Sequence, residues 1–225
     1  DRIYRIYENY SMNGKEEDYY QVSGAVAPAM RSEIPGVEDA TRLTYIGGDN
    51  TLFTTPDKQR YSARYIMMAD SNVFDIFPVP ILSGNPKVVL AKPWYAMISR
   101  SLAEKIREGN SLESVIGKTL SVDRKEPMSI RGVFEDMGEN ADIHFDVVVP
   151  MSKLWNLARG GWGYDISYMS IIRFRDPAKD IKAVEARIPD MLKKYMADSS
   201  NKKKSHRFSF RPLLEYHTAD PTVRL

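Results

Sequence analysis

The order strand, helix, strand occurs near both ends of the sequence, and this repeat constrains the fold more than any other feature. Near the amino end, residues 3–10 alternate apolar and polar side chains, which is typical of a strand. An Asn-Gly pair and the charged residues after it are expected to end that strand. A helix is expected from Val26, because Pro28 is tolerated only in a first turn, and residues 40–46 predict a second strand.

The carboxyl end repeats this order. Residues 168–174 predict a strand, and the apolar side chains between Ile181 and Tyr195 recur at helical spacing. Phe208 and Phe210 belong to a final expected strand. Two β-α-β units in one chain predict an α+β fold of the split β-α-β, ferredoxin-like type, in which both helices cover one face of one sheet.

The middle of the sequence is richer in expected strands than in helices. Residues 117–122 and 128–134 predict the two arms of a hairpin, and residues 143–149 predict another strand. Ser99 is expected to cap a short helix. Gly132 is expected at a bend, or where the backbone approaches a neighbour too closely for a side chain.

We therefore predict that a β-rich subdomain is inserted into a subdomain built from the two terminal units. The expected boundaries assign residues 1–60 to the first β-α-β unit, residues 61–165 to the insertion and residues 166–225 to the second β-α-β unit. A length of 225 residues is sufficient for two small domains with packed cores.

Composition excludes several classes of function. The 32 Lys and Arg residues nearly balance the 30 Asp and Glu residues, so no overall charge favours nucleic acid, and none is expected as a partner. The basic run at residues 202–204 is interpreted as part of a solvent-exposed loop. The absence of cysteine excludes thiol nucleophiles, cysteine-ligated metals and disulfides. No apolar stretch of the sequence is long enough to span a bilayer.

Asp142, His144 and Asp146 are the residues with the chemistry of a metal or general-base site. They alternate along the strand expected at residues 143–149, so their side chains share one face. Two carboxylates beside an imidazole can bind a divalent metal or orient a base. No second histidine is near them in the sequence, and a polar strand face is the preferred interpretation. We expect no catalytic residue, metal or cofactor; a stand-alone metal-dependent hydrolase is the alternative.

Trp155, Trp162 and Tyr164 belong to a stretch rich in glycine and aromatic residues. Exposed aromatic side chains on a loop often contact a partner or an apolar ligand, so these three are the candidate contact residues. The alternative is that they fill the core. A soluble peptide-binding or glycan-binding module remains a further interpretation of the whole chain. The glycines do not form a nucleotide loop, because the required Lys-Ser or Lys-Thr ending is missing.

Several segments of the chain together carry a family resemblance. They are residues 70–77, 80–86, 96–103, 116–120, 130–136 and 140–146, with residues 4–7, 27–37 and 211–213 towards the two ends. In this order and spacing they resemble the MacB-like periplasmic core domain of FtsX-like ABC transporter permeases. The resemblance covers most of residues 1–151.

The resemblance implies a porter-type subdomain with an inserted β-rich, sabre-type subdomain. Such domains lie between the first and second membrane helices of a permease, which implies a membrane tether at both ends and a location on the periplasmic face of the bacterial inner membrane. The implied partners are a cytoplasmic ATPase, a second permease protomer and a periplasmic or outer-membrane protein. The implied function is mechanotransmission, which couples ATP-driven motion to substrate export or to control of a partner, without enzyme activity.

Attachment of the domain to the membrane at both of its ends leads to a geometric prediction. Asp1 and Leu225 are expected to lie near each other and to point the same way, because both chain ends would enter one membrane. A stand-alone enzyme or a soluble binding module has no such requirement.

Overall fold

The chain divides into two compact units. The computed structural model describes residues 2–12, 15–46, 51–56, 58–122, 127–138, 141, 143–154, 162, 168–196 and 205–213. The terminal unit comprises Asp1–Arg42 and Asn156–Leu225, and the central unit comprises Leu43–Trp155.

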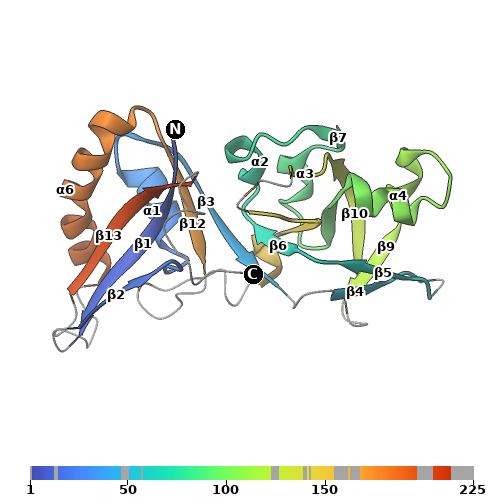
Figure 1. Ribbon diagram of the computed structural model, residues 1–225, viewed down its shortest axis with the longest axis horizontal. Helices are drawn as coiled ribbons and strands as arrows, with labels where there is room; N and C mark the ends of the chain where they lie inside the picture. Colours follow the sequence, from blue (N-terminus) through green and yellow to red (C-terminus); the bar gives the residue numbers. More distant parts are fainter. Residues whose placement is uncertain are drawn as a thin grey trace. The chain divides into compact units, whose positions relative to one another are not determined.

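Four strands form the main sheet of the terminal unit. Their order is β13 (Ser205–Pro212), β1 (Ile3–Met12), β12 (Met169–Phe174) and β3 (Val37–Tyr45) (Figure 1). β1 is antiparallel to both of its neighbours. The strands of the second β-α-β unit therefore interleave with those of the first, which is the split arrangement, and the predicted α+β fold is confirmed.

β1 is longer than expected. It continues to Met12 and pairs with β2 (Lys15–Tyr19), from Glu8 opposite Tyr19 to Met12 opposite Lys15. The strand ends directly before the Asn-Gly pair, as predicted, but the charged residues after the pair form a second strand that was not predicted. Asn-Gly is the pair favoured in two-residue hairpin connections, and charged residues are tolerated on an exposed hairpin arm.

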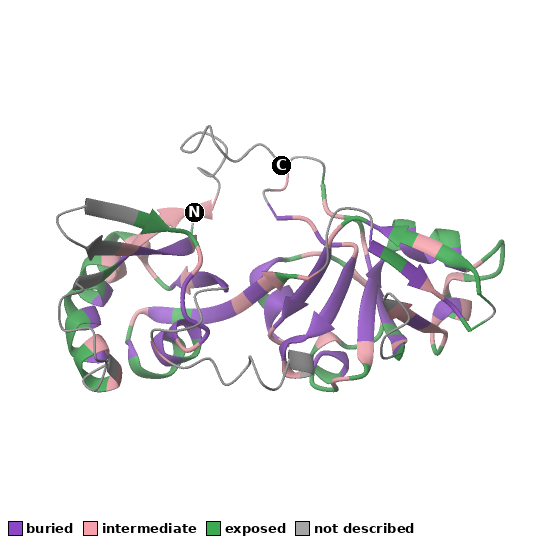
Figure 2. Cartoon of the chain, turned by 90° about the horizontal axis from the view of Figure 1, so that it is seen from below, coloured by how far each residue is buried: buried purple, intermediate pink, exposed green. Residues whose placement is uncertain are grey.

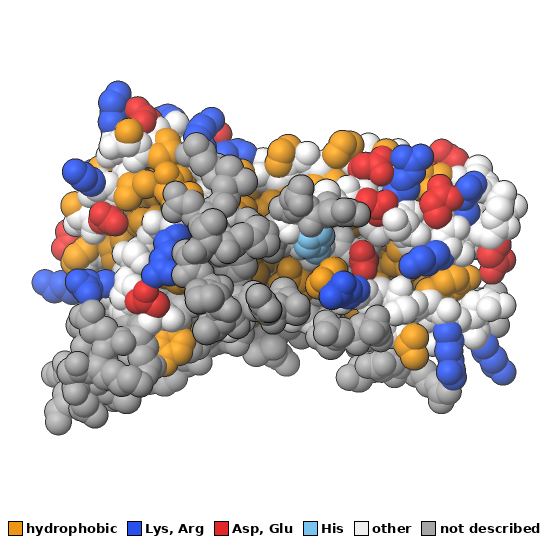
Figure 3. Space-filling model, in the orientation of Figure 1, with side chains coloured by type: hydrophobic (Ala, Val, Ile, Leu, Met, Phe, Trp, Pro, Cys, Tyr) orange, Lys and Arg blue, Asp and Glu red, His pale blue; other side chains and the backbone are white. Residues whose placement is uncertain are grey.

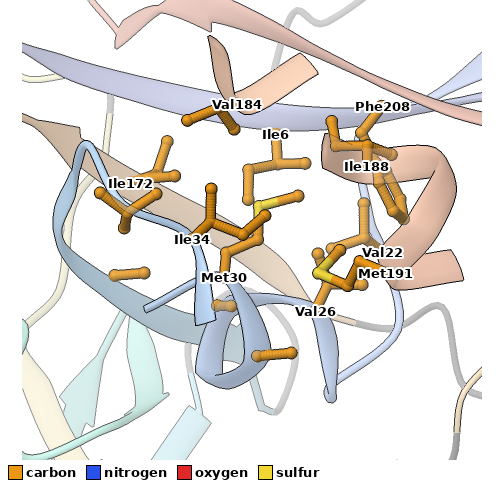
Figure 4. Packing of buried hydrophobic residues seen from close by; sticks show 14 of the residues in the cluster. Ile6, Val22, Val26, Met30, Ile34, Ile172, Val184, Ile188, Met191 and Phe208 are labelled. Atoms are coloured by element: carbon orange, nitrogen blue, oxygen red, sulfur yellow. The ribbon is translucent and has the colours of Figure 1, made fainter. Parts of the chain in front are cut away.

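Two helices pack on one face of this sheet, as predicted. α1 (Val26–Glu33) begins at the expected residue, and α6 (Pro177–Met196) contains Pro189. α1 ends before Gly36, whose φ of +98° is the left-handed conformation that favours glycine. Buried side chains of both helices meet buried side chains of the strands in one cluster (Figure 4); the cluster includes Ile6, Val22, Val26, Met30, Ile34, Ile172, Val184, Ile188, Met191 and Phe208.

The central unit contains a mixed sheet. Its strands follow the order β6 (Ile66–Ala69), β11 (Val147–Pro150), β8 (Tyr95–Ser99), β10 (Pro127–Phe134), β9 (Thr119–Val122), β4 (Thr51–Thr54) and β5 (Arg60–Ala63), and β7 (Ile81–Ser83) pairs with β10. β6 is parallel to β11 and β8 is parallel to β10. All residues of β6 and β11 are buried, which explains their continuous apolar sequences. β9 and β10 form the predicted antiparallel hairpin.

Short helical segments accompany this sheet. They are α2 (Val73–Ile76), α3 (Pro86–Val89), α4 (Arg100–Ile106) and the 3-10 turns η1 (Leu112–Val115) and η2 (Met151–Leu154). Phe74, Phe134 and Phe145 contact one another with ring centroids 5.3 to 5.8 Å apart. Phe77 contacts Phe145 at 6.4 Å. This aromatic cluster anchors α2 and the segment before β11 against β10.

The boundaries between the units differ from those expected after residues 60 and 165. The first lies at Arg42, because β4 pairs with β5 and β9 and so belongs to the central unit. The second lies at Trp155, directly after η2. The error in the first boundary arose because β4 and β5 were not predicted as strands.

Burial follows the layers within each unit. Figure 2 shows α6 with buried residues on one side and exposed residues on the other, as its amphipathic sequence predicts. Among the described residues, no helix has both the length and the apolar character needed to cross a bilayer. On the face drawn in Figure 3, described acidic and basic side chains are interspersed.

Candidate functional site

Trp162 is the one candidate contact residue that lies within the described part of the chain; Trp155 and Tyr164 lie outside it. Trp162 is half-buried and packs against the core of the terminal unit. Its ring stacks on Tyr195 of α6, with centroids 4.6 Å apart and planes 5° apart. The Tyr195 hydroxyl hydrogen-bonds to the Glu33 carboxylate at the end of α1. Trp162 therefore has a packing role in the described structure, and its role in partner contact stays a prediction.

Trp94 is an exposed aromatic residue that sequence reasoning missed. Its side chain is 49% exposed, whereas its carbonyl accepts a 2.8 Å hydrogen bond from the Ser129 N–H. The backbone of this residue is thus fixed while the indole faces solvent. Val88 and Leu82 of the same unit are also exposed. Trp94 directly follows a Lys-Pro pair and lies outside the strands expected from the sequence. That position could have marked it as an exposed residue.

Asp146 serves the backbone of the central unit. Its Oδ2 accepts hydrogen bonds from the N–H groups of Arg64 (2.8 Å) and Tyr65 (3.3 Å). Its own N–H donates to the Tyr65 carbonyl at 2.7 Å, and its carbonyl accepts from the Ser99 N–H at 2.7 Å. Both its carboxylate and its peptide groups therefore join neighbouring segments, which is a structural use of this side chain.

His144 packs against a neighbouring ring and forms no metal site with Asp146 among the described residues. The His144 ring stacks on Tyr65, with centroids 5.6 Å apart, and Asp142 lies outside the described residues. Within the described ranges, no three His, Asp or Glu side chains group as metal ligands would. The strand expected from residue 143 begins only at Val147, and the Asp146 carboxylate before it accepts hydrogen bonds from residues directly before β6.

Ser99 has the predicted capping role. Its side chain is 1% exposed, and its Oγ accepts a 3.3 Å hydrogen bond from the Leu102 N–H at the start of α4. Asp136 accepts from both the N–H and the hydroxyl of Ser101, at 3.0 and 2.7 Å. The first turn of α4 is thereby held to the end of β10.

The sheet face of the terminal unit opposite the helices carries stacked cations and aromatic rings. The Arg5 guanidinium lies 5.7 Å from the Tyr7 ring centroid and 4.8 Å from that of Tyr20. Arg211 lies 4.2 Å from the Tyr7 ring on β1, and its Nη2 is 2.5 Å from Asp18 Oδ2 on β2. Cation–π contacts and this ion pair join β13, β1 and β2.

The start of β1 and the end of β13 lie side by side. The ladder runs from Tyr4 opposite Pro212 to Ser11 opposite Ser205. Arg2 adds a hydrogen bond from its Nε to the Phe174 carbonyl (3.0 Å) and an ion pair with Glu38. The first described residues are thus fixed to β12 and β3 as well as to β13. Asp1 and Leu225, on which the prediction of converging ends was made, lie outside the described residues.

A pocket of about 420 Å³ lies beside the outermost strand of the terminal unit. It is lined by Asn9 of β1, by Glu185, Ile188 and Pro189 of α6, and by Arg207, Phe208 and Ser209 of β13. Its walls combine the buried side chains of Ile188 and Phe208 with the exposed side chains of Glu185, Pro189 and Arg207.

Several solved structures are similar to this one, among them the following two. A domain assigned to a permease of Porphyromonas gingivalis has a TM-score of 0.82 at 28% sequence identity, covering 94% of this chain and 90% of that one. The periplasmic region of MacB from Actinobacillus actinomycetemcomitans has a TM-score of 0.63 at 13% identity, covering 94% and 89%. No protein-family model and no curated protein matches the sequence. The resemblance to MacB-like periplasmic permease domains is therefore confirmed.

Proposed function

We propose that this chain is the periplasmic domain of an ABC transporter permease, and that it passes ATP-driven motion of the membrane helices to a substrate or to a partner protein. The observation that supports this most strongly is the similarity to a permease domain over 94% of the chain, at 28% identity and a TM-score of 0.82. A likeness of this extent includes both units.

The terminal unit is suited to be attached at two points. The start of β1 and the end of β13 are neighbours in one ladder, so chain segments leaving them depart from the same end of the sheet. Motion applied there acts on two hydrogen-bonded strands that share one core with α1 and α6. Such a unit moves as one rigid body when a force is applied to these strands, because packed cores transmit strain with little deformation.

Asp146, one of the three residues considered for a metal-dependent hydrolase, has a structural role, and so does Ser99. Asp146 binds two backbone N–H groups, and Ser99 caps α4. These uses support a mechanical and binding role over the metal-dependent hydrolase. The proposed partners are a cytoplasmic ATPase, a second permease protomer and a periplasmic or outer-membrane protein, and the proposed location is the periplasmic face of the inner membrane.

The proposal is tested in the full-length permease, purified with its ATPase and reconstituted in lipid nanodiscs. The domain has no cysteine. With any cysteine elsewhere in the full-length permease replaced, spin labels attached at Arg187→Cys and Trp94→Cys of one protomer report the distance between its two units. Both positions are exposed. We expect this distance, or the distance between the Arg187 positions of two protomers, to change between nucleotide-free and ATP-bound states.

A second pair gives the matched control. Labels at Arg187→Cys and Ser32→Cys lie on α6 and α1 of the same unit, whose shared core predicts a constant distance. If ATP is hydrolysed while every distance between units and between protomers stays constant, the coupling function is wrong. Failure of the full-length protein to associate with any ATPase would contradict the permease assignment itself.

A further inference from the structure

We propose that the surface formed by α3 and the start of β8 contacts the headgroup region of an anionic lipid bilayer. This surface, the α3–β8 patch, carries the exposed side chains of Val88, Lys92, Trp94 and Arg131. The contact depends on the proposed function only for the nearness of a membrane. Its physical basis is a fixed backbone with exposed apolar side chains and cations that lack carboxylate partners.

The patch carries the two most exposed large apolar side chains among the described residues. Val88 is 58% exposed and Trp94 is 49% exposed. Val89 and Leu90, which lie between them in the sequence, are buried. α3 also packs against β8 and β10. The exposed apolar side chains are therefore held at the surface by a segment that is anchored in the core of the central unit.

Hydrogen bonds fix the backbone of this segment. The Asn85 side chain caps α3 by accepting a 3.0 Å hydrogen bond from the Lys87 N–H. A turn follows, in which the Lys92 N–H donates to the Val89 carbonyl and the Tyr95 N–H donates to the Lys92 carbonyl, both at 3.1 Å. The exposure of the apolar side chains is thus a property of a hydrogen-bonded backbone, and their position is set before any ligand binds.

The sequence of this segment is basic. No Asp or Glu occurs at residues 76–103, which contain Lys87, Lys92 and Arg100. Lys87 and Arg100 form ion pairs with acidic residues outside that range. Lys92 is exposed and has no acidic partner among the described residues. One cation of the segment is therefore available to an anionic ligand.

Arg131 adds a second cation to the patch. β10 pairs with β8, and the Arg131 guanidinium lies 5.0 Å from the centroid of the Tyr95 ring. Tyr95 closes the turn that begins at Lys92, so both cations belong to the same end of β8. Arg131 is exposed, and within the described ranges no acidic side chain pairs with it. Two such cations beside exposed apolar side chains are complementary to an apolar surface that carries negative charge.

This combination favours a bilayer over a protein as the occupant. Tryptophan prefers the interface between lipid and water, and Lys and Arg side chains are attracted to anionic headgroups. Two apolar side chains present far less area than the roughly 800 Å² per partner that a stable protein interface buries. A domain attached to the membrane needs only a weak contact, because attachment raises its local concentration at the bilayer. The expected contact is therefore weak and reversible.

The test uses the 225-residue chain, which has no cysteine, with an environment-sensitive fluorophore on Ala91→Cys. Ala91 is exposed and lies between the two apolar residues of the patch. We expect the emission to shift to shorter wavelength with vesicles of equal parts phosphatidylglycerol and phosphatidylcholine. Binding to phosphatidylcholine alone should be at least about tenfold weaker. The same fluorophore on Ser62→Cys of β5, an exposed position outside the patch, is the matched control and should not shift.

Two pairs of variants test the side chains of the patch. Lys92→Glu should weaken vesicle binding at least about fivefold, whereas Lys105→Glu on α4, with the same change in net charge, should have little effect. Trp94→Ala should weaken binding measurably, whereas Leu52→Ala on β4, which removes another exposed apolar side chain, should not. All four side chains are exposed, and circular dichroism checks that each variant keeps its fold.

Several outcomes would overturn the proposal. They are the absence of a shift with the anionic vesicles, equal binding to both kinds of vesicle, and equal weakening by Lys92→Glu and Lys105→Glu. An equal shift with a soluble peptide of alternating leucine and glutamate would assign the patch to an acidic protein instead. A shift that appears without lipid as the protein concentration rises would assign it to a second copy of this chain. Failure of vesicle binding while the full-length protein associates with its ATPase rejects only the lipid contact.

Discussion

Tyr4 and Pro212 are direct partners in the antiparallel ladder of β1 and β13. The pair joins two residues that are far apart in the sequence, and it sets the start of the first strand beside the end of the last one. Any segments that continue the chain from these two points leave the terminal unit from the same end of its sheet. This is the geometry that a domain attached twice to one membrane requires.

The two described tryptophans should respond differently to truncation. Trp162→Ala removes the stack on Tyr195 and should lower the free energy of unfolding by about 2 kcal/mol. Trp94→Ala removes a side chain that is 49% exposed and should lower it by less. Urea denaturation of both variants measures the difference. If the two variants lose equal amounts of unfolding free energy, the Trp162 stack on Tyr195 contributes little to stability.

Two glycines with the same left-handed backbone provide a steric comparison. Gly84 (φ +81°) and Gly109 (φ +83°) both disfavour a side chain, but a Cβ on Gly84 would lie 2.3 Å from the Arg131 carbonyl oxygen, whereas none of the described atoms lies within 4 Å of a Cβ on Gly109. Gly109→Ala should destabilise by about 1 kcal/mol and Gly84→Ala by more than about 3 kcal/mol. The ratio of folded to unfolded protein in denaturant tests this ranking, and the reverse order would contradict the described turn at Gly84.

Loss of the α4 cap should be measurable. Ser99→Ala leaves the Leu102 N–H without its side-chain acceptor and should destabilise the central unit by about 1 kcal/mol. Ser62→Ala, an exposed change on β5, is the control and should be neutral within about 0.5 kcal/mol. Thermal unfolding followed by circular dichroism compares them, and an unaltered Ser99→Ala melting temperature would argue against the cap.

Asp146 should prove to be a structural residue and not a metal ligand. Asp146→Ala removes the acceptor of two backbone N–H groups and should destabilise by about 2 kcal/mol, whereas Asp146→Asn keeps an oxygen there and should lose less. Zinc or manganese ions should raise the melting temperature of neither the original chain nor His144→Ala. Stabilisation by either metal that disappears in His144→Ala would favour the hydrolase alternative.

The repeated β-α-β order was readable from the sequence because its signals are local. The start of α1 at Val26 and the cap at Ser99 depend on neighbouring residues only, and both were predicted correctly. The expected close approach at Gly132 was also correct, since a Cβ there would meet Met97 and the Ser83 carbonyl.

The features that were missed depend on contacts distant in sequence. β4 and β5 have only four residues each, and the pairing of β5 with β4 and of β4 with β9 assigns them to the central unit. Asp146 was predicted to be part of an alternating strand. Its hydrogen-bond donors, the N–H groups of Arg64 and Tyr65, are about 80 residues away, and the neighbouring sequence gives no sign of them. Trp162 was expected either to contact a partner or to fill the core, and its stacking partner Tyr195 was not predicted because it lies in another element.

The most direct test of the central claim is the labelling of a single cysteine in intact cells that express the full-length protein. Trp94→Cys introduces one exposed thiol into a domain that has none. We expect a membrane-impermeant maleimide to label it from the periplasm, and the labelled protein to remain in the membrane after alkaline extraction. A thiol that is labelled only after the inner membrane is broken, or a full-length protein that alkaline extraction releases, would contradict a periplasmic permease domain.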